Sequence, residues 1–143
     1  MRTIFIFLLF LSSIIGSKAQ TFSINSLIGT KWEQIEENDA YTKTIIEFND
    51  TAMIETVKFF VTKNTCHVSR PYYLSKEVPV SFNRNLVGKK TTGSYLVMLY
   101  KFNRMDYMTI KKITSDTLLL FHRQTNAIGG YAHTFVYKRI KST

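Results

Sequence analysis

The C-terminal stretch, residues 115–141, constrains the fold more than any other part of the chain, because it predicts two long β-strands joined by a loop. In residues 131–140 alternate side chains fall on one face of an extended chain: Tyr131, His133, Phe135, Tyr137 and Arg139. Residues 117–124 form an apolar run, and the loop that follows ends in two glycines, which tolerate the positive φ angles of a turn. Residues 107–114 predict a further strand, so we expect a three-stranded antiparallel meander.

The rest of the chain repeats this pattern of short strands separated by turn residues. Alternating or β-branched runs predict strands at residues 30–37, 42–49, 52–62, 65–69 and 94–101. About eight short strands form either a sandwich or a barrel, and a closed barrel leaves no strand edge exposed. The sequence therefore predicts an all-β fold, a single antiparallel up-and-down β-barrel of about eight strands.

Residues 70–93 interrupt this regularity. They contain both prolines of the chain, Pro71 and Pro79. Proline cannot donate to a β-ladder, so this segment is expected to be an edge strand or a loop, and it is the predicted gate of the barrel.

The first 19 residues are predicted to be a cleaved signal peptide. A basic Arg2 precedes an apolar run that is too short to span a bilayer comfortably, and the small side chains of Ser17 and Ala19 fit a cleavage site before Gln20. Residues 20–143 then form one domain, secreted or periplasmic, without stable membrane insertion. Cys66 is the only cysteine, so an internal disulfide is impossible.

Charge is distributed unevenly along the chain. Loss of the predicted signal lowers the formal charge from +9 to +7, and residues 84–143 hold eleven basic and two acidic residues. Such a surface attracts anions, although lysines that alternate with apolar residues are also typical of the solvated faces of strands.

The pattern of reactive side chains predicts no enzyme, cofactor or metal. Cys66 and His67 are neighbours on a strand and point to opposite faces, so a buried structural cysteine is expected rather than a nucleophile with its base. The three histidines, His67, His122 and His133, match no metal-ligand spacing. Gly129-Gly130 precedes a strand and not a helix, which excludes a phosphate-binding loop. Export from the cytoplasm argues against nucleic acid as a partner.

Several short motifs resemble small secreted lipocalin-like β-barrel proteins of Bacteroidetes-type bacteria. Residues 27–32, Leu-Ile-Gly-Thr-Lys-Trp, place a glycine shortly before a tryptophan on the first predicted strand. Residues 72–75, 87–95 and 131–141 are also similar to that group. The resemblance implies an up-and-down barrel with an apolar cavity and no catalytic residues. It also implies that a basic side chain from the last strand, Arg139, covers Trp32 and plugs one end of the barrel.

The predicted function is that of a secreted non-enzymatic binding protein, which holds a small apolar or amphipathic anionic ligand inside the barrel. The candidate ligand-binding residues are Tyr95, Val97, Leu99, Tyr131, His133, Phe135 and Tyr137. The ligand entrance is expected at the end opposite the plug, near residues 70–93. The alternative is an interaction or structural module of the cell envelope, with a filled barrel and a protein or glycan partner. The sequence leaves the oligomeric state open.

Overall fold

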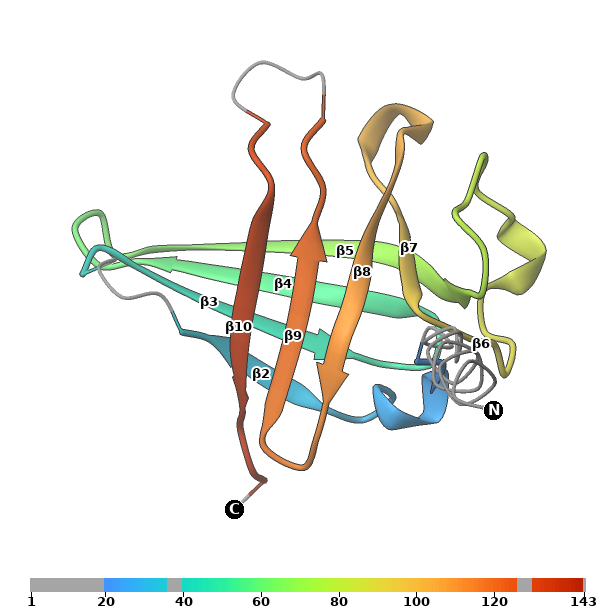
Figure 1. The fold of residues 1–143 in the computed structure, drawn as a ribbon. Helices are drawn as coiled ribbons and strands as arrows, with labels where there is room; N and C mark the ends of the chain where they lie inside the picture. The colour runs from blue at the N-terminus through green and yellow to red at the C-terminus, as the bar shows by residue number, and fades with distance from the viewer. Residues whose placement is uncertain (1–19, 36–39, 126–129, 143) are drawn as a thin grey trace, which may run out of the picture.

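Eight antiparallel strands close into one barrel in the order β10–β2–β3–β4–β5–β7–β8–β9 (Figure 1). The computed structural model describes residues 20–35, 40–125 and 130–142. The barrel strands are β2 (Lys31–Gln34), β3 (Thr42–Phe48), β4 (Ala52–Phe59), β5 (Asn64–Ser75), β7 (Tyr95–Leu99), β8 (Met105–Ile113), β9 (Thr117–His122) and β10 (His133–Arg139). Strands β1 (Phe22–Ser23) and β6 (Thr92–Gly93) pair with each other outside the barrel. Short 3-10 helices lie at Ile24–Ser26, Arg84–Leu86 and Lys101–Asn103. The predicted all-β, up-and-down barrel is confirmed.

The C-terminal meander and the closure of the barrel are both present as predicted. Strand β9 pairs with β8 on one side and with β10 on the other. The first and last barrel strands then meet, with Tyr137 opposite Gln34 and Arg139 opposite Trp32. Residues 1–19, the predicted signal, lie outside the described part of the chain, as do residues 36–37 of the predicted first strand and residues 126–129 of the predicted loop.

One half of the barrel interior is filled by apolar side chains. Residues directly opposite each other on paired strands share a face, so the strand registers define which residues point inward. The inward set that forms the buried core comprises Trp32, Ile46, Phe48, Met53, Tyr72, Leu74, Leu96, Met98, Ile110, Leu118, Leu120 and Tyr137. Full burial of one such side chain stabilises the fold by roughly 1.5–3 kcal/mol, so this half provides most of the stability.

Trp32 and Arg139 close this filled end. The guanidinium carbon of Arg139 lies 5.6 Å from the centre of the Trp32 ring, within the range of a cation–π contact. The Trp32 indole N–H donates to the Thr30 hydroxyl at 2.6 Å, and Thr30 donates in turn to the Leu27 carbonyl. The predicted contact between the first and last strands is therefore present, and the buried indole nitrogen has a partner.

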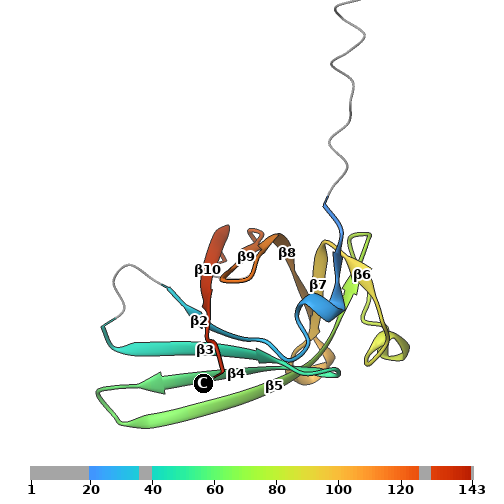
Figure 2. The ribbon, with the colours of Figure 1, turned by 90° about the horizontal axis from the view of Figure 1, so that it is seen from below.

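Residues 70–93 do not form the predicted entrance, and that prediction is wrong. Residues 70–75 belong to β5, which pairs with β4 and β7. The remainder lies at the filled end, where Gly93 pairs with Phe22 and the backbone N–H of Ile24 donates to Thr91 at 3.0 Å. Figures 1 and 2 show this segment beside the N-terminal strand, away from the β4–β5 turn. Among the described residues, the opposite end of the barrel is the open one.

The two halves of the sheet separate toward this open end. Strands β3, β4 and β5 form one layer and β8, β9 and β10 the other, and the two layers cross at a steep angle (Figures 1 and 2). No helix in the described residues has the length and apolar character needed to cross a bilayer.

Candidate binding site

A slit opens in the barrel wall between β5 and β7, and Pro71 explains its position. Strand β5 has twelve residues, yet its ladder with β7 covers only Tyr72–Ser75 opposite Tyr95–Met98. The next residue of β5 is Pro71, which has no backbone N–H to continue that ladder. Beyond Leu99, β7 turns away into Lys101–Asn103, where Phe102 adopts a φ of 60°. The two strands therefore part.

The slit is a pocket of about 540 Å³, a volume typical of small-ligand sites. Its two walls are residues 66–70 of β5 and residues 99–102 with Arg104 at the β7–β8 turn. Inward side chains, such as Val68, and outward ones, such as Ser69, both line it. The pocket thus passes from the outer surface into the open half of the barrel.

One wall of the slit is a strand edge with unused backbone groups. At the β3–β4 turn, the Asn49 N–H donates to the Ala52 carbonyl, which fixes the alternation of hydrogen bonds along β4. On β4 the backbone groups of Met53 and Glu55 therefore point away from β3 and toward β5. Their partners on β5 are Arg70 and Val68, whose backbone groups point back toward β4. Those of His67 and Ser69 point the other way, into the slit, and those of Thr65 point the same way just beyond the lining residues.

Arg70 is the charged group at the inner end of the slit. Its side chain is only 12% exposed, and Nη2 donates to Glu55 Oε1 at 3.1 Å. The guanidinium carbon lies 4.5 Å from the centre of the Tyr100 ring. Nε is buried and has no hydrogen-bond partner among the described residues. A buried donor left unpaired costs about 1–3 kcal/mol, so an acceptor that reached Arg70 Nε would be stabilised.

Tyr100 and two further cations complete the polar surroundings of Arg70. Burial raises the pKa of Tyr100, Arg70 and Arg104 act to lower it, and the Asp106 and Glu55 carboxylates add to the rise, so the phenol remains a hydrogen-bond donor at neutral pH. Lys101 and Arg104 line the outer part of the slit and are exposed. No carboxylate of the described residues lines this pocket, although Glu55 pairs with Arg70, so the excess positive charge of its surface comes from Lys101 and Arg104.

A second charged cluster lies on the rim between β8 and β9, and it is structural in character. Asp106 accepts hydrogen bonds from His122 Nε2 at 2.7 Å, from Arg123 Nη1 at 2.9 Å and from the Tyr107 N–H at 2.8 Å. Burial acts to raise the pKa of Asp106, but these hydrogen bonds outweigh it and hold the pKa below its usual range. With three donors in place, the carboxylate has little capacity left to act on a substrate.

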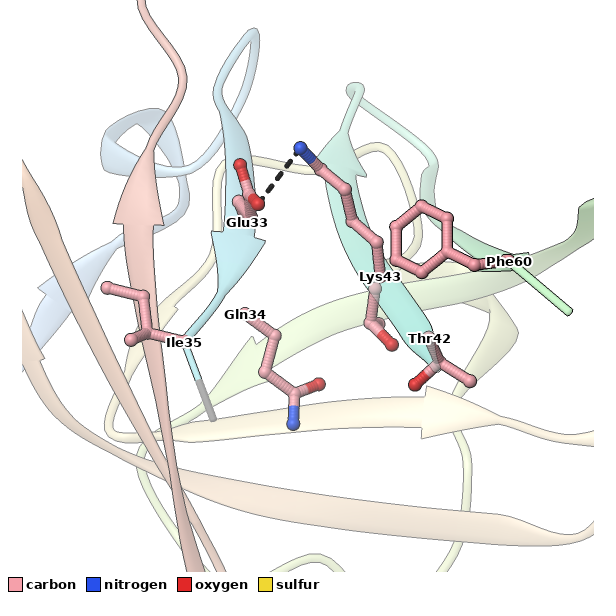
Figure 3. Close-up of a pocket in the computed structure, with 7 residues that line it drawn as sticks. Glu33, Gln34, Ile35, Thr42, Lys43 and Phe60 are labelled. Carbon is pink, nitrogen blue, oxygen red and sulfur yellow. Dashed lines mark ion pairs between the residues drawn. The ribbon is translucent and has the colours of Figure 1, made fainter. Parts of the chain in front are cut away.

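A second pocket, of about 430 Å³, opens where β2 leaves β3 at the same end of the barrel (Figure 3). The β2–β3 ladder stops after Glu33, and β2 continues along β10. Figure 3 shows Glu33 and Lys43 directed at each other, with Phe60 beside Lys43. Their ion pair measures 2.9 Å, and both side chains are more than a third exposed. The one cation that lines this pocket, Lys43, is paired, whereas the slit also holds Lys101 and Arg104, which form no ion pair among the described residues, so this pocket is the weaker candidate.

Three of the predicted ligand-binding residues face the wrong way. Tyr95, Val97 and Leu99 lie on the outer face of β7, whereas the interior receives Leu96 and Met98. The Tyr95 ring packs against Tyr107 on this outer face, and Val97 is buried there opposite Tyr73. Leu99 does reach the slit, but from its outer side.

The other predicted ligand-binding residues lie on or next to β10. Phe135 and Tyr137 point inward, and Tyr137 is part of the filled core. His133 meets the Phe135 ring edge to face with ring centres 4.6 Å apart, while Tyr131 is 79% exposed. None of the four lines the slit. Arg70 and Tyr100 were not identified as binding residues from the sequence. For Arg70 the available signal was its position directly before Pro71 in a strand-like run.

Cys66 lies on β5 with a free thiol, but it is exposed, so the expectation of a buried cysteine is wrong. His67 points to the other face, where Nδ1 lies 3.0 Å from the Thr56 hydroxyl. The strand geometry thus separates the thiol from the imidazole. No group of three or more histidine, cysteine or acidic side chains suited to a metal ion occurs among the described residues.

Comparison with known proteins adds no family to this description. No protein-family model matches the chain, and no curated protein or solved structure is significantly similar to it. The function has to be argued from the geometry of the slit.

Proposed function

We propose that this chain is an exported, non-enzymatic binding protein that takes a small amphipathic anion into the slit between β5 and β7. The observation that supports this most strongly is Arg70, a nearly buried cation with an unpaired Nε at the inner end of a pocket. The predicted signal peptide supports export, and the resemblance to small lipocalin-like proteins agrees with a binding role.

The anionic group of the ligand enters first. At the inner end, Arg70 Nε offers a donor in a desolvated setting, where a hydrogen bond to an anion is roughly twice as strong as one between neutral groups. The apolar part then lies outward along Val68, Leu99 and Phe102, of which Phe102 is 99% exposed and gains cover from the ligand.

The filled half of the barrel limits how far a ligand can enter. Core side chains such as Phe48, Tyr72 and Met98 are at most 1% exposed. A ligand therefore occupies the slit and the open half of the barrel, which favours a short molecule over a long chain wholly enclosed in the interior.

Calorimetric titration with decanoate and with decanol, its uncharged counterpart, tests this proposal. We expect decanoate to bind about tenfold or more tightly, because a hydrogen bond to a charged group contributes roughly 1.5–3 kcal/mol. Arg70→Gln removes this preference, whereas Lys90→Gln, an equal change of charge on an exposed residue outside the slit, retains it. Equal affinity for the acid and the alcohol, or an unaltered preference in Arg70→Gln, contradicts the proposal.

A second candidate function, that of an interaction module, is favoured by an apolar patch at the open end. Tyr41, Phe60 and Val61 are 67%, 54% and 75% exposed, and the Phe60 N–H donates to the Tyr41 carbonyl, so these residues lie close together along the chain ends of β3 and β4. Exposed apolar clusters of this kind mark contact surfaces for partners. If Phe60→Ser abolishes a partner interaction and leaves decanoate binding intact, the patch and the slit are separate sites.

A further inference from the structure

We infer that the slit takes the C-terminal end of an extended peptide, which adds to β5 as a new strand and places its terminal carboxylate at Arg70. This inference rests on the proposed binding function of the slit and names the class of ligand. It follows from three features of the slit: the free edge of β5, the β5–β7 ladder that closes one end, and the positive charge of the lining residues.

The edge of β5 matches a peptide backbone better than an alkyl chain. His67 and Ser69 direct their N–H and carbonyl groups into the slit, and Thr65 continues the same strand edge beyond it, with the spacing of every second strand residue. Residues 65–69 extend over roughly 13 Å at about 3.3 Å per residue, which is room for about four peptide residues. An extended peptide that joins such an edge gains main-chain hydrogen bonds, whereas a hydrocarbon tail makes none.

A peptide that lies along β5 has to end where the β5–β7 ladder begins. A strand lying along residues 65–70 is blocked at the next position, because Tyr72 is already paired with Met98 of β7. Only a chain terminus fits at that point. Arg70 makes it the C-terminus, since a guanidinium binds a carboxylate and repels the ammonium of an N-terminus. The peptide therefore runs parallel to β5, from Asn64 toward Arg70.

The cations of the outer wall favour acidic peptides. Lys101 and Arg104 lie along the β7–β8 side of the slit and form no ion pair with a carboxylate of the described residues. Acidic side chains upstream of the carboxylate would meet these two cations, which adds specificity and speeds association more than it adds affinity.

The inference is tested with a fluorescein-labelled pool of mixed-sequence hexapeptides that end in a free carboxylate, and with the same pool as C-terminal amides. Fluorescence anisotropy is expected to show at least about tenfold tighter binding of the acids, because the amides lack the charge that Arg70 recognises. In the unsubstituted protein, the acid pool is expected to slow amide hydrogen exchange at Thr65, His67 and Ser69 by about tenfold or more, and decanoate is not.

Ser69→Pro supplies the matched variant. Proline at this position removes one N–H that points into the slit and spares the β4 ladder, so affinity for the acid peptides should fall about tenfold, and by a larger factor than affinity for decanoate, which needs no main-chain donor. Equal binding of acid and amide peptides, or unaltered exchange at the three amides, overturns the inference. If decanoate alone binds, the proposed function stands and the peptide inference fails. If neither decanoate nor peptide binds, both fail.

Discussion

At the scale of single residues, the charged side chains of the open end divide into satisfied and unsatisfied groups. Asp106 accepts three hydrogen bonds and holds the rim of β8 and β9 together. Arg70 has one carboxylate partner, one aromatic neighbour and an Nε with no acceptor. Buried polar groups are nearly always paired, and for this reason we place the anionic group of the proposed ligand beside Arg70.

Asp106 provides a prediction about pH. Its folded-state pKa lies below the ordinary value of 3.8, so its contribution to stability is present above that pH and is lost as the pH falls through the folded-state pKa. Asp106→Asn should therefore lower stability at pH 7 by about 1–2 kcal/mol, and it should weaken the loss of stability between pH 5 and pH 3. Urea unfolding at several pH values measures both effects. Asp50→Asn, at an exposed turn, is the control, and parallel pH curves for Asp106→Asn and the unsubstituted protein would contradict the assignment.

At the scale of elements, β5 shows what a proline does and does not reveal in a sequence. The sequence predicted that residues 70–93 are edge strand or loop because proline lacks an N–H. At Pro71 the missing N–H does end one ladder, the ladder with β7. The prediction was wrong about the strand, which continues through Pro71 to Ser75. The N–H that proline lacks faces β7, and the ladder with β4 on the other side is unaffected. The neighbouring strand toward which a backbone N–H points depends on the strand register, and the register cannot be read from the sequence.

This alternation along β5 predicts opposite responses to proline at two adjacent positions. The Val68 N–H donates into the β4 ladder, so Val68→Pro should cost about 2 kcal/mol or more. The Ser69 N–H points into the slit, so Ser69→Pro should cost less than about 1 kcal/mol. Urea unfolding of the two variants measures the difference. Equal destabilisation would show that the register assigned to β5 is wrong.

At the scale of the whole molecule, the strand number and the barrel closure could be predicted, and the position of the mouth could not. Turn residues and alternating side chains predicted all eight strands, and the Trp32–Arg139 contact followed from a family resemblance. The inward face of β7 was predicted wrongly because its Leu96 and Val97 are both buried, one in the core and one on the outer face. The entrance was misplaced because alternate connections of an up-and-down barrel share an end, which puts residues 76–93 beside the β3–β4 turn.

The closed end provides a test of the barrel as a unit. Arg139→Ala should destabilise the protein by about 1 kcal/mol, because it removes a cation over a fully buried indole. Lys138→Ala, at the exposed neighbouring position, should change stability by less than about 0.5 kcal/mol. Thermal unfolding of both variants compares the two. If they are equally stable, the contact between the first and last strands contributes nothing.

The slit as the site of anion binding is tested most directly by a titration of the ¹⁵N-labelled protein with decanoate, followed in ¹H–¹⁵N NMR spectra that include the Arg70 Nε–H. The largest shifts are predicted at residues 65–71 and 99–104, together with a downfield shift of the Arg70 Nε–H as it gains an acceptor. Residues of the second pocket, among them Thr44 and Phe60, should remain unshifted. Shifts centred on that second pocket, or an Arg70 Nε–H that does not move at saturation, would contradict the assignment of the slit as the binding site.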